Sequence, residues 1–144
     1  MPATPEILEV LGGPDPQSRR VRTPEDMKAW IREGLPFSSL EAVMSRFQLN
    51  RDEVSSALDL PPRTLARRKQ ERRLRPSESD RLFRLARIAA QASEVLGNEV
   101  KASRWLHTPN RALGGKPPLT LLDTDLGARQ VEAVVGRIED GVYW

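Results

Sequence analysis

The segment Arg51–Lys69 reads RDEVSSALDLPPRTLARRK and predicts two short helices joined by a tight turn. Asn50 is a favourable cap for the first helix, and Pro62 suits the start of the second. Asp59 tolerates the left-handed backbone of such a turn better than most residues do. The segment therefore has the form of a helix-turn-helix. Its two helices would pack together through Leu58, Leu60 and Leu65.

Positive charge is concentrated in and directly after this motif. Residues Pro62–Arg87 hold ten basic residues against three acidic ones, which gives this stretch a net charge of +7. Because the whole chain carries +3 at pH 7, the remaining residues together carry −4. Positive charge gathered at helical spacing favours contact with a phosphate backbone.

The second helix of the motif is the predicted DNA-reading helix, since its N-terminal residues would enter a major groove. Arginine can bind guanine O6 and N7 with two hydrogen bonds. A solvated basic face is the plain alternative, and non-specific RNA binding is a weaker one because no aromatic platform accompanies the arginines. We predict that Arg63, Thr64, Arg67 and Arg68 face outward toward base edges, and that Lys69, Arg72 and Arg73 contact phosphates.

The chain around the motif predicts an all-α protein, because strand-like alternation is scarce and Ala, Leu, Arg and Glu are abundant. Thr23 and Pro24 open a helix that Gly34 ends. Residues 1–22 hold four prolines and few apolar anchors, so we expect a flexible arm there, with at most one short turn of helix. Further helices are expected at 38–47, 80–96, 99–106 and from 125 onward.

Composition excludes several functional classes. The chain has no cysteine and one histidine, so a thiolate or histidine metal site is not expected, and no cofactor is indicated. No nucleophile–base pair is visible, which argues against an enzyme. No apolar run approaches the roughly 20 residues of a membrane span, and no secretory signal is apparent. We therefore expect a cytoplasmic protein without membrane contact.

The C-terminal third, Ala102–Tyr143, reads ASRWLHTPNRALGGKPPLTLLDTDLGARQVEAVVGRIEDGVY. The order of its motifs, Trp-Leu, Pro-Asn-x-Ala-Leu-Gly-Gly, Pro-Leu-x-Leu-Leu, Thr-x-x-Gly-Ala and Gly-Val-Tyr, resembles the toxin-binding domain of Xre/MbcA/ParS-type antitoxins. Upstream, Arg63–Lys69 and Glu78–Leu82 resemble the Xre-like part of the same family. The resemblance covers about residues 34–143.

This resemblance implies an Xre-like helix-turn-helix domain over residues 23–97 and a small helical toxin-binding domain over residues 98–144. It also implies an antitoxin that covers the active site of a RES-domain, NAD-degrading toxin and represses its own operon by binding operator DNA. The toxin-binding residues that it implies are Asn110, Leu113, Gly114, Thr124, Arg137, Gly141, Val142, Tyr143 and Trp144.

Two points remain open from the sequence. The terminal Val142-Tyr143-Trp144 either packs back onto its own domain or anchors in the toxin. The alternative to an antitoxin is a stand-alone helix-turn-helix repressor whose C-terminal helices serve only dimerisation. A homodimer is expected in both cases, because one reading helix contacts only a few base pairs.

Overall fold

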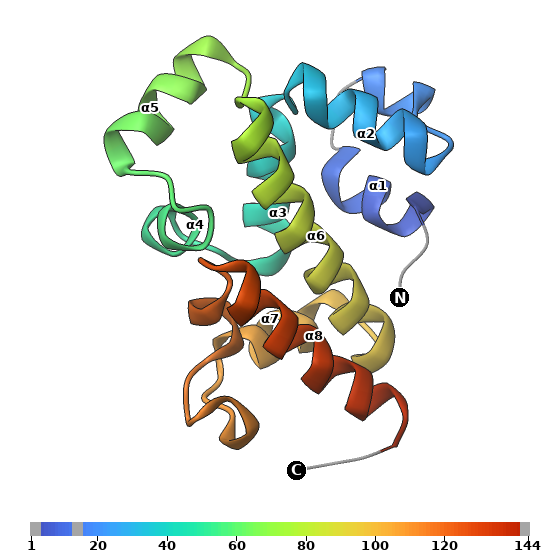
Figure 1. Ribbon diagram of the computed structural model, residues 1–144, viewed down its shortest axis with the longest axis vertical. Helices are drawn as coiled ribbons and strands as arrows, with labels where there is room; N and C mark the ends of the chain where they lie inside the picture. The colour runs from blue at the N-terminus through green and yellow to red at the C-terminus, as the bar shows by residue number, and fades with distance from the viewer. Residues whose placement is uncertain (1–3, 13–15, 142–144) are drawn as a thin grey trace.

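The computed structural model describes residues 4–12 and 16–141, and within them the chain forms helices and no strand (Figure 1). The predicted all-α class is therefore confirmed. The α-helices are α1 (Thr4–Gly12), α2 (Pro24–Glu33), α3 (Phe37–Phe47), α4 (Arg51–Ala57), α5 (Pro62–Glu71), α6 (Pro76–Leu96), α7 (Glu99–His107) and α8 (Asp125–Glu139). The short 3-10 helices are η1 (Pro16–Arg20), η2 (Arg111–Leu113) and η3 (Pro118–Leu121).

Helix α6 is the central element and runs through the middle of the molecule (Figure 1). Pro76 suits its first turn, and Gly97 ends it in the left-handed conformation with a φ of 111°. Helices α1, α2, α7 and α8 all pack against it. Since Leu82, Leu85 and Ile88 are at most 1% exposed, α6 supplies the middle of the hydrophobic core.

Side-chain caps begin α2 and α4 where the sequence predicts helix starts. The Asp26 amide donates to Thr23 Oγ1 over 3.1 Å, and the Thr23 amide donates back to Asp26 Oδ2 over 3.2 Å. Asn50 and Glu53 form the same reciprocal arrangement at the start of α4. These capping boxes satisfy backbone amides that a helix start leaves unpaired, and the one at Asn50 sets the start of the first helix of the helix-turn-helix.

The expectation of a flexible arm over residues 1–22 is wrong for the described part of that segment. Helix α1 packs against α3 and α6. Leu11 is fully buried, and Ile7 and Val10 are at most 5% exposed. These three side chains share one helix face, and their burial outweighs the helix-breaking tendency of the surrounding prolines.

The N-terminal and C-terminal parts of the chain share one hydrophobic core, which extends from α1 to α8. Polar contacts join them as well, because Ser103 Oγ of α7 donates to the Phe47 carbonyl of α3 over 2.6 Å. His107 Nε2 of α7 lies 3.0 Å from Glu53 Oε2 of α4. Among the described helices, none is long and apolar enough to cross a membrane.

Candidate nucleic-acid and protein interfaces

The connection between α4 and α5 has the predicted helix-turn-helix geometry. Asp59 adopts a left-handed backbone with a φ of 49°. The Leu60 amide donates to the Ser55 carbonyl over 2.8 Å, which closes the turn. Leu58, Leu60 and Leu65 are each at most 5% exposed, so the two helices pack through the predicted residues.

The outer face of α5 carries the exposed cations. Arg63, Arg67 and Lys69 are exposed on this helix, and Thr64 is half-buried between them. Within the described ranges, neither Arg63 nor Arg67 has an ion-pair partner. Arg72 follows directly, exposed and in a left-handed conformation with a φ of 64°. These side chains are therefore available to an anionic partner.

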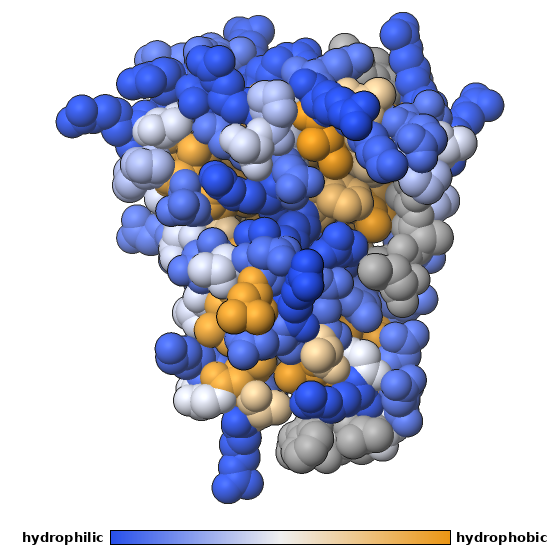
Figure 2. Space-filling view, viewed as in Figure 1, coloured by the Kyte–Doolittle hydropathy of each residue, from blue (hydrophilic) through white to orange (hydrophobic). Residues whose placement is uncertain are grey.

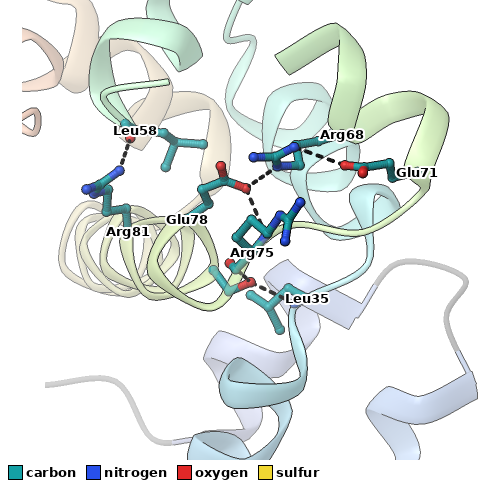
Figure 3. Close-up of polar contacts among 8 residues, drawn as sticks. Leu35, Leu58, Arg68, Glu71, Arg75, Glu78 and Arg81 are labelled. Atoms are coloured by element: carbon teal, nitrogen blue, oxygen red, sulfur yellow. Dashed lines mark hydrogen bonds and ion pairs between the residues drawn. The ribbon is translucent and has the colours of Figure 1, made fainter. Parts of the chain in front are cut away.

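Arg68 does not face outward, contrary to the prediction. It is 7% exposed, and its Nε donates to Glu78 Oε1 over 2.8 Å while its Nη1 donates to Glu71 Oε1 over 2.9 Å (Figure 3). Burial by itself raises the pKa of the Glu78 carboxyl, but hydrogen bonds from Arg68 and from the Arg75 amide bring that pKa below its usual value. The same pairing raises the pKa of Arg68. Arg68 thus belongs to the interior of the motif.

Arg73 is exposed but is engaged with its own chain. Its Nη1 donates to the Gly34 carbonyl over 2.9 Å, at the end of α2. Beside it, the Leu74 amide donates to the Leu35 carbonyl over 2.9 Å. A side chain on Gly34 would lie 2.3 Å from the Leu74 carbonyl, so only glycine permits this approach. The connector between α5 and α6 is therefore held against the one between α2 and α3.

The arginines of α6 are also turned toward the protein. Arg81 donates to the Leu58 carbonyl over 3.2 Å, at the end of α4. Arg84 donates to the Leu122 carbonyl over 3.0 Å. Arg87 Nη2 lies 2.8 Å from a Glu132 carboxylate oxygen of α8. The basic stretch Pro62–Arg87 thus contains one exposed group of cations on α5 and one group on α6 that joins helices together.

Two residues of the predicted toxin-binding set shape the loop between α7 and α8. Asn110 Oδ1 accepts from the Ala112 amide over 2.9 Å, and the Asn110 amide donates to the Lys116 carbonyl over 3.1 Å. Leu113 is 8% exposed and belongs to the core. Gly114 is exposed, with a φ of 69° that favours glycine. Of these residues, Gly114 is the one the loop presents on its surface.

The remaining predicted toxin-binding residues lie on or after α8. Thr124 accepts from the Gly127 amide over 3.0 Å and so caps that helix. A side chain on Gly127 would lie 2.0 Å from the Leu121 carbonyl, which explains the glycine in the first turn of α8. Arg137 and Gly141 are exposed. Val142, Tyr143 and Trp144 lie outside the described residues.

Sequence reasoning did not single out the most exposed apolar side chains. Within the described ranges, the exposed large apolar residues are Val100 on α7 and Leu126 on α8, with 61% and 71% of their surface accessible. Figure 2 shows apolar patches amid a largely polar surface in the lower half of the molecule, where α8 begins in Figure 1. The signal in the sequence is that Leu126 falls outside the face formed by Val131, Val134 and Val135.

Comparison with known proteins finds two family models that match successive parts of the chain. Residues 27–87 match the family model of the antitoxin Xre-like helix-turn-helix domain, and residues 91–141 match that of the antitoxin Xre/MbcA/ParS C-terminal toxin-binding domain. The chain is 32% identical over 115 residues to Antitoxin Xre of Yersinia enterocolitica, covering 78% of each chain. It is 30% identical over 110 residues to the mycobacterial cidal antitoxin MbcA of Mycobacterium tuberculosis, covering 74% of this chain and 93% of that one. It is 25% identical over 131 residues to the Prs ADP-ribosylating antitoxin of Sphingobium sp., covering 84% and 82%.

Proposed function

Because the chain belongs to the Xre/MbcA/ParS family of antitoxins, we propose that it neutralises a RES-domain, NAD-degrading toxin and represses its own operon through α5. The C-terminal part would cover the active site of the toxin, and the helix-turn-helix would bind operator DNA. The protein would thus act through two surfaces on one hydrophobic core.

The observation that carries the DNA-binding half is the exposed row of cations on the second helix of a helix-turn-helix. Arg63 and Arg67 are one helical turn apart, so they lie on the same face of α5. In this proposal they reach base edges together with Thr64. Lys69 and Arg72 follow at the end of the helix, where phosphates would lie. A homodimer would present two such helices to two half-sites.

The toxin-binding half would use the surface around α8. The family model for the toxin-binding domain includes this helix, and Leu126 is the most exposed large apolar side chain of the described residues. An exposed leucine in a polar surrounding suits the buried centre of a protein interface. We assign Gly114, Arg137, Gly141 and the terminal residues 142–144 to the same interface. Asn110, Leu113 and Thr124 would act by holding its shape.

Co-purification and an NAD assay test the toxin-binding half. The protein is co-expressed with a RES-domain toxin encoded beside it, and NAD consumption is measured with and without the antitoxin. Full neutralisation is expected from the intact chain, with impaired neutralisation from a variant lacking residues 140–144 that still binds DNA. Full neutralisation by the shortened variant would contradict the role of the tail. A toxin that consumes NAD only by transferring ADP-ribose to protein, without releasing free ADP-ribose, would contradict the assigned toxin activity.

Binding to the promoter DNA of its own operon tests the other half. Arg67→Ala should weaken binding to this DNA by about 1–3 kcal/mol relative to random DNA, because a base contact is lost. Arg129→Ala is the matched control, since Arg129 is an exposed arginine on α8, outside the motif. Equal losses in the two variants would show that general positive charge, rather than α5, carries the binding. A wild-type protein that binds random and promoter DNA alike would contradict autorepression.

A further inference from the structure

The attachment of α5 to the rest of the protein is narrow. Only two of its ten residues are buried, Leu65 and Arg68. They are three positions apart and therefore lie on one face, while Arg63 and Arg67 lie on the exposed side. Between the turn that precedes α5 and the connector that follows it, the helix is therefore held by one buried apolar side chain and one buried charged side chain.

The charged contact is anchored in the core through α6. Glu78 is 5% exposed in the first turn of α6, where its Oε1 accepts both from Arg68 Nε and from the Arg75 amide, each over 2.8 Å (Figure 3). Next to it, Ser79 Oγ accepts from the Leu35 amide and donates to the Arg75 carbonyl. Glu78 is therefore a fixed acceptor, and a guanidinium that binds it through Nε is held in one direction.

The contact between Arg68 and Glu78 restricts rotation of α5 about its own axis. The turn before α5 and the connector after it hold the ends of the helix, whereas Leu65 adds an apolar contact that has no direction. A bond from Arg68 to a fixed carboxylate sets the roll. Because adjacent helix positions are about 100° apart, Arg67 is then directed away from the body of the protein. A change of roll would move the exposed side chains away from any base edges they reach.

We propose that Arg68 and Glu78 form a positioning pair that sets the orientation of α5 and thereby the specificity of DNA binding. This inference rests on the proposed DNA-binding function. Base contacts need fixed donor directions, whereas phosphate contacts tolerate rotation of long side chains. The pair should therefore affect promoter binding strongly and binding to random DNA weakly.

Removal of the Glu78 charge distinguishes positioning from simple electrostatics. If the charge near the basic face only repelled DNA, Glu78→Gln would tighten binding to all DNA. If Glu78 positions α5, the same change weakens promoter binding although the protein becomes more positive. Arg68→Gln should act in the same direction, and the double variant should be no weaker than either single one, since the three variants lack the same contact.

The experiment measures promoter and random DNA affinity over a salt series for these three variants. We expect roughly a tenfold loss of promoter affinity, little change on random DNA, and an unchanged salt slope. Glu71→Gln is the matched control: Glu71 also pairs with Arg68, but its side chain is 43% exposed and outside α6, so a much smaller loss is expected. Tighter promoter binding by Glu78→Gln, or a salt slope lowered by about one in Arg68→Gln, would identify Arg68 as a DNA contact and overturn the inference.

A second readout keeps the inference testable without DNA. Amide hydrogen exchange of α5 should accelerate in Glu78→Gln and remain near wild type in Glu71→Gln, because only the first loosens the helix. Equal exchange in the two variants would overturn the positioning role. If the wild-type protein does not prefer its promoter, the proposed function fails. The exchange comparison alone then tests whether Arg68 and Glu78 position α5. Arg68→Lys serves if Arg68→Gln does not fold, since it keeps the charge without the guanidinium geometry.

Discussion

The arginines of α5 and those of α6 lie in one continuous basic stretch of the sequence, but they have opposite surroundings. Arg63 and Arg67 are exposed and have no ion-pair partner among the described residues. Arg84 and Arg87 are half-buried and contact the Leu122 carbonyl and the Glu132 carboxylate. The cause is the position of each helix. Helix α5 lies at the edge, whereas α6 is surrounded, so its arginines meet carbonyls and carboxylates of neighbouring helices.

This difference shows that net charge in a sequence window overestimates the charge that a partner can meet. Arginine can bury its aliphatic stem and extend its guanidinium to a carbonyl or carboxylate, so it also joins helices. Arg81, Arg84 and Arg87 are spaced by three and form one row, which joins α6 to the end of α4, to the segment before α8 and to α8. Arg68 shows the same behaviour within α5 itself.

The largest expected effect is the difference in the free energy of unfolding between variants of Arg68 and of its neighbour Arg67. Arg68→Ala leaves Glu78 buried without its charged partner, so the free energy of unfolding should fall by about 3 kcal/mol. Arg67→Ala should change it by less than about 0.5 kcal/mol, since the side chain is exposed. Urea denaturation monitored by circular dichroism measures both values. Similar losses in the two variants would remove the distinction between inward and outward arginines on α5.

Acidification should weaken the pair of Arg68 and Glu78 only partly. Protonation removes the charge of the Glu78 carboxyl but leaves its side chain in place. The folded-state pKa of Glu78 lies below its usual value, so its stabilisation is complete above the unfolded pKa of about 4.3 and is lost as pH falls through the folded pKa. Thermal unfolding from pH 6 to 2 should show a shallower loss in Glu78→Gln than in wild type. Identical profiles would indicate that the carboxyl has the same pKa in both states.

The helix boundaries were largely predictable from the sequence, and the environment of single side chains was not. Thr23 and Asn50 act locally, through residues three positions away, so their capping roles follow from the sequence. The prediction that Arg68 faces DNA was wrong because its direction depends on a distant partner. That partner is Glu78, which lies ten positions away on another helix. Likewise, α1 is stable because α3 and α6 cover its apolar face. The prolines near α1 made this segment look non-helical in the sequence.

The sequence predicted the helices of the C-terminal part correctly, but it did not separate residues that hold the fold from residues on the surface. Thr124 begins α8 as expected, and Asn110 closes a tight loop. Both residues hold the fold, although the family resemblance placed them among the toxin contacts. A residue can belong to a family motif because it shapes a surface or because it contacts a partner, and the motif alone does not distinguish the two. Leu126 is the opposite case: no motif includes it, and its exposure follows from its position outside the packed valine face of α8.

Arg87 tests whether an arginine of α6 stabilises the protein without contributing to DNA binding. Its Nη2 lies 2.8 Å from Glu132 Oε1, with 25% and 20% of the two side chains exposed. Arg87→Ala should lower the free energy of unfolding by about 1.5 kcal/mol, because a charged hydrogen bond between helices is lost. Promoter affinity of the folded protein, measured by fluorescence anisotropy, should stay near wild type. A loss of affinity comparable to that of Arg67→Ala would place α6 within the DNA-binding surface.

The smallest effect should come from Arg129, which has a carboxylate partner but remains in water. Its Nε lies 2.9 Å from Asp125 Oδ2, nearly the same distance as in the Arg87 pair, yet 76% and 64% of these side chains are exposed. Solvent screening and the entropy of ordering two free side chains offset most of the attraction. Arg129→Ala should therefore change the free energy of unfolding by less than about 0.5 kcal/mol in urea denaturation. A loss equal to that of Arg87→Ala would mean that pair distance, rather than burial, decides what an arginine contributes in this fold.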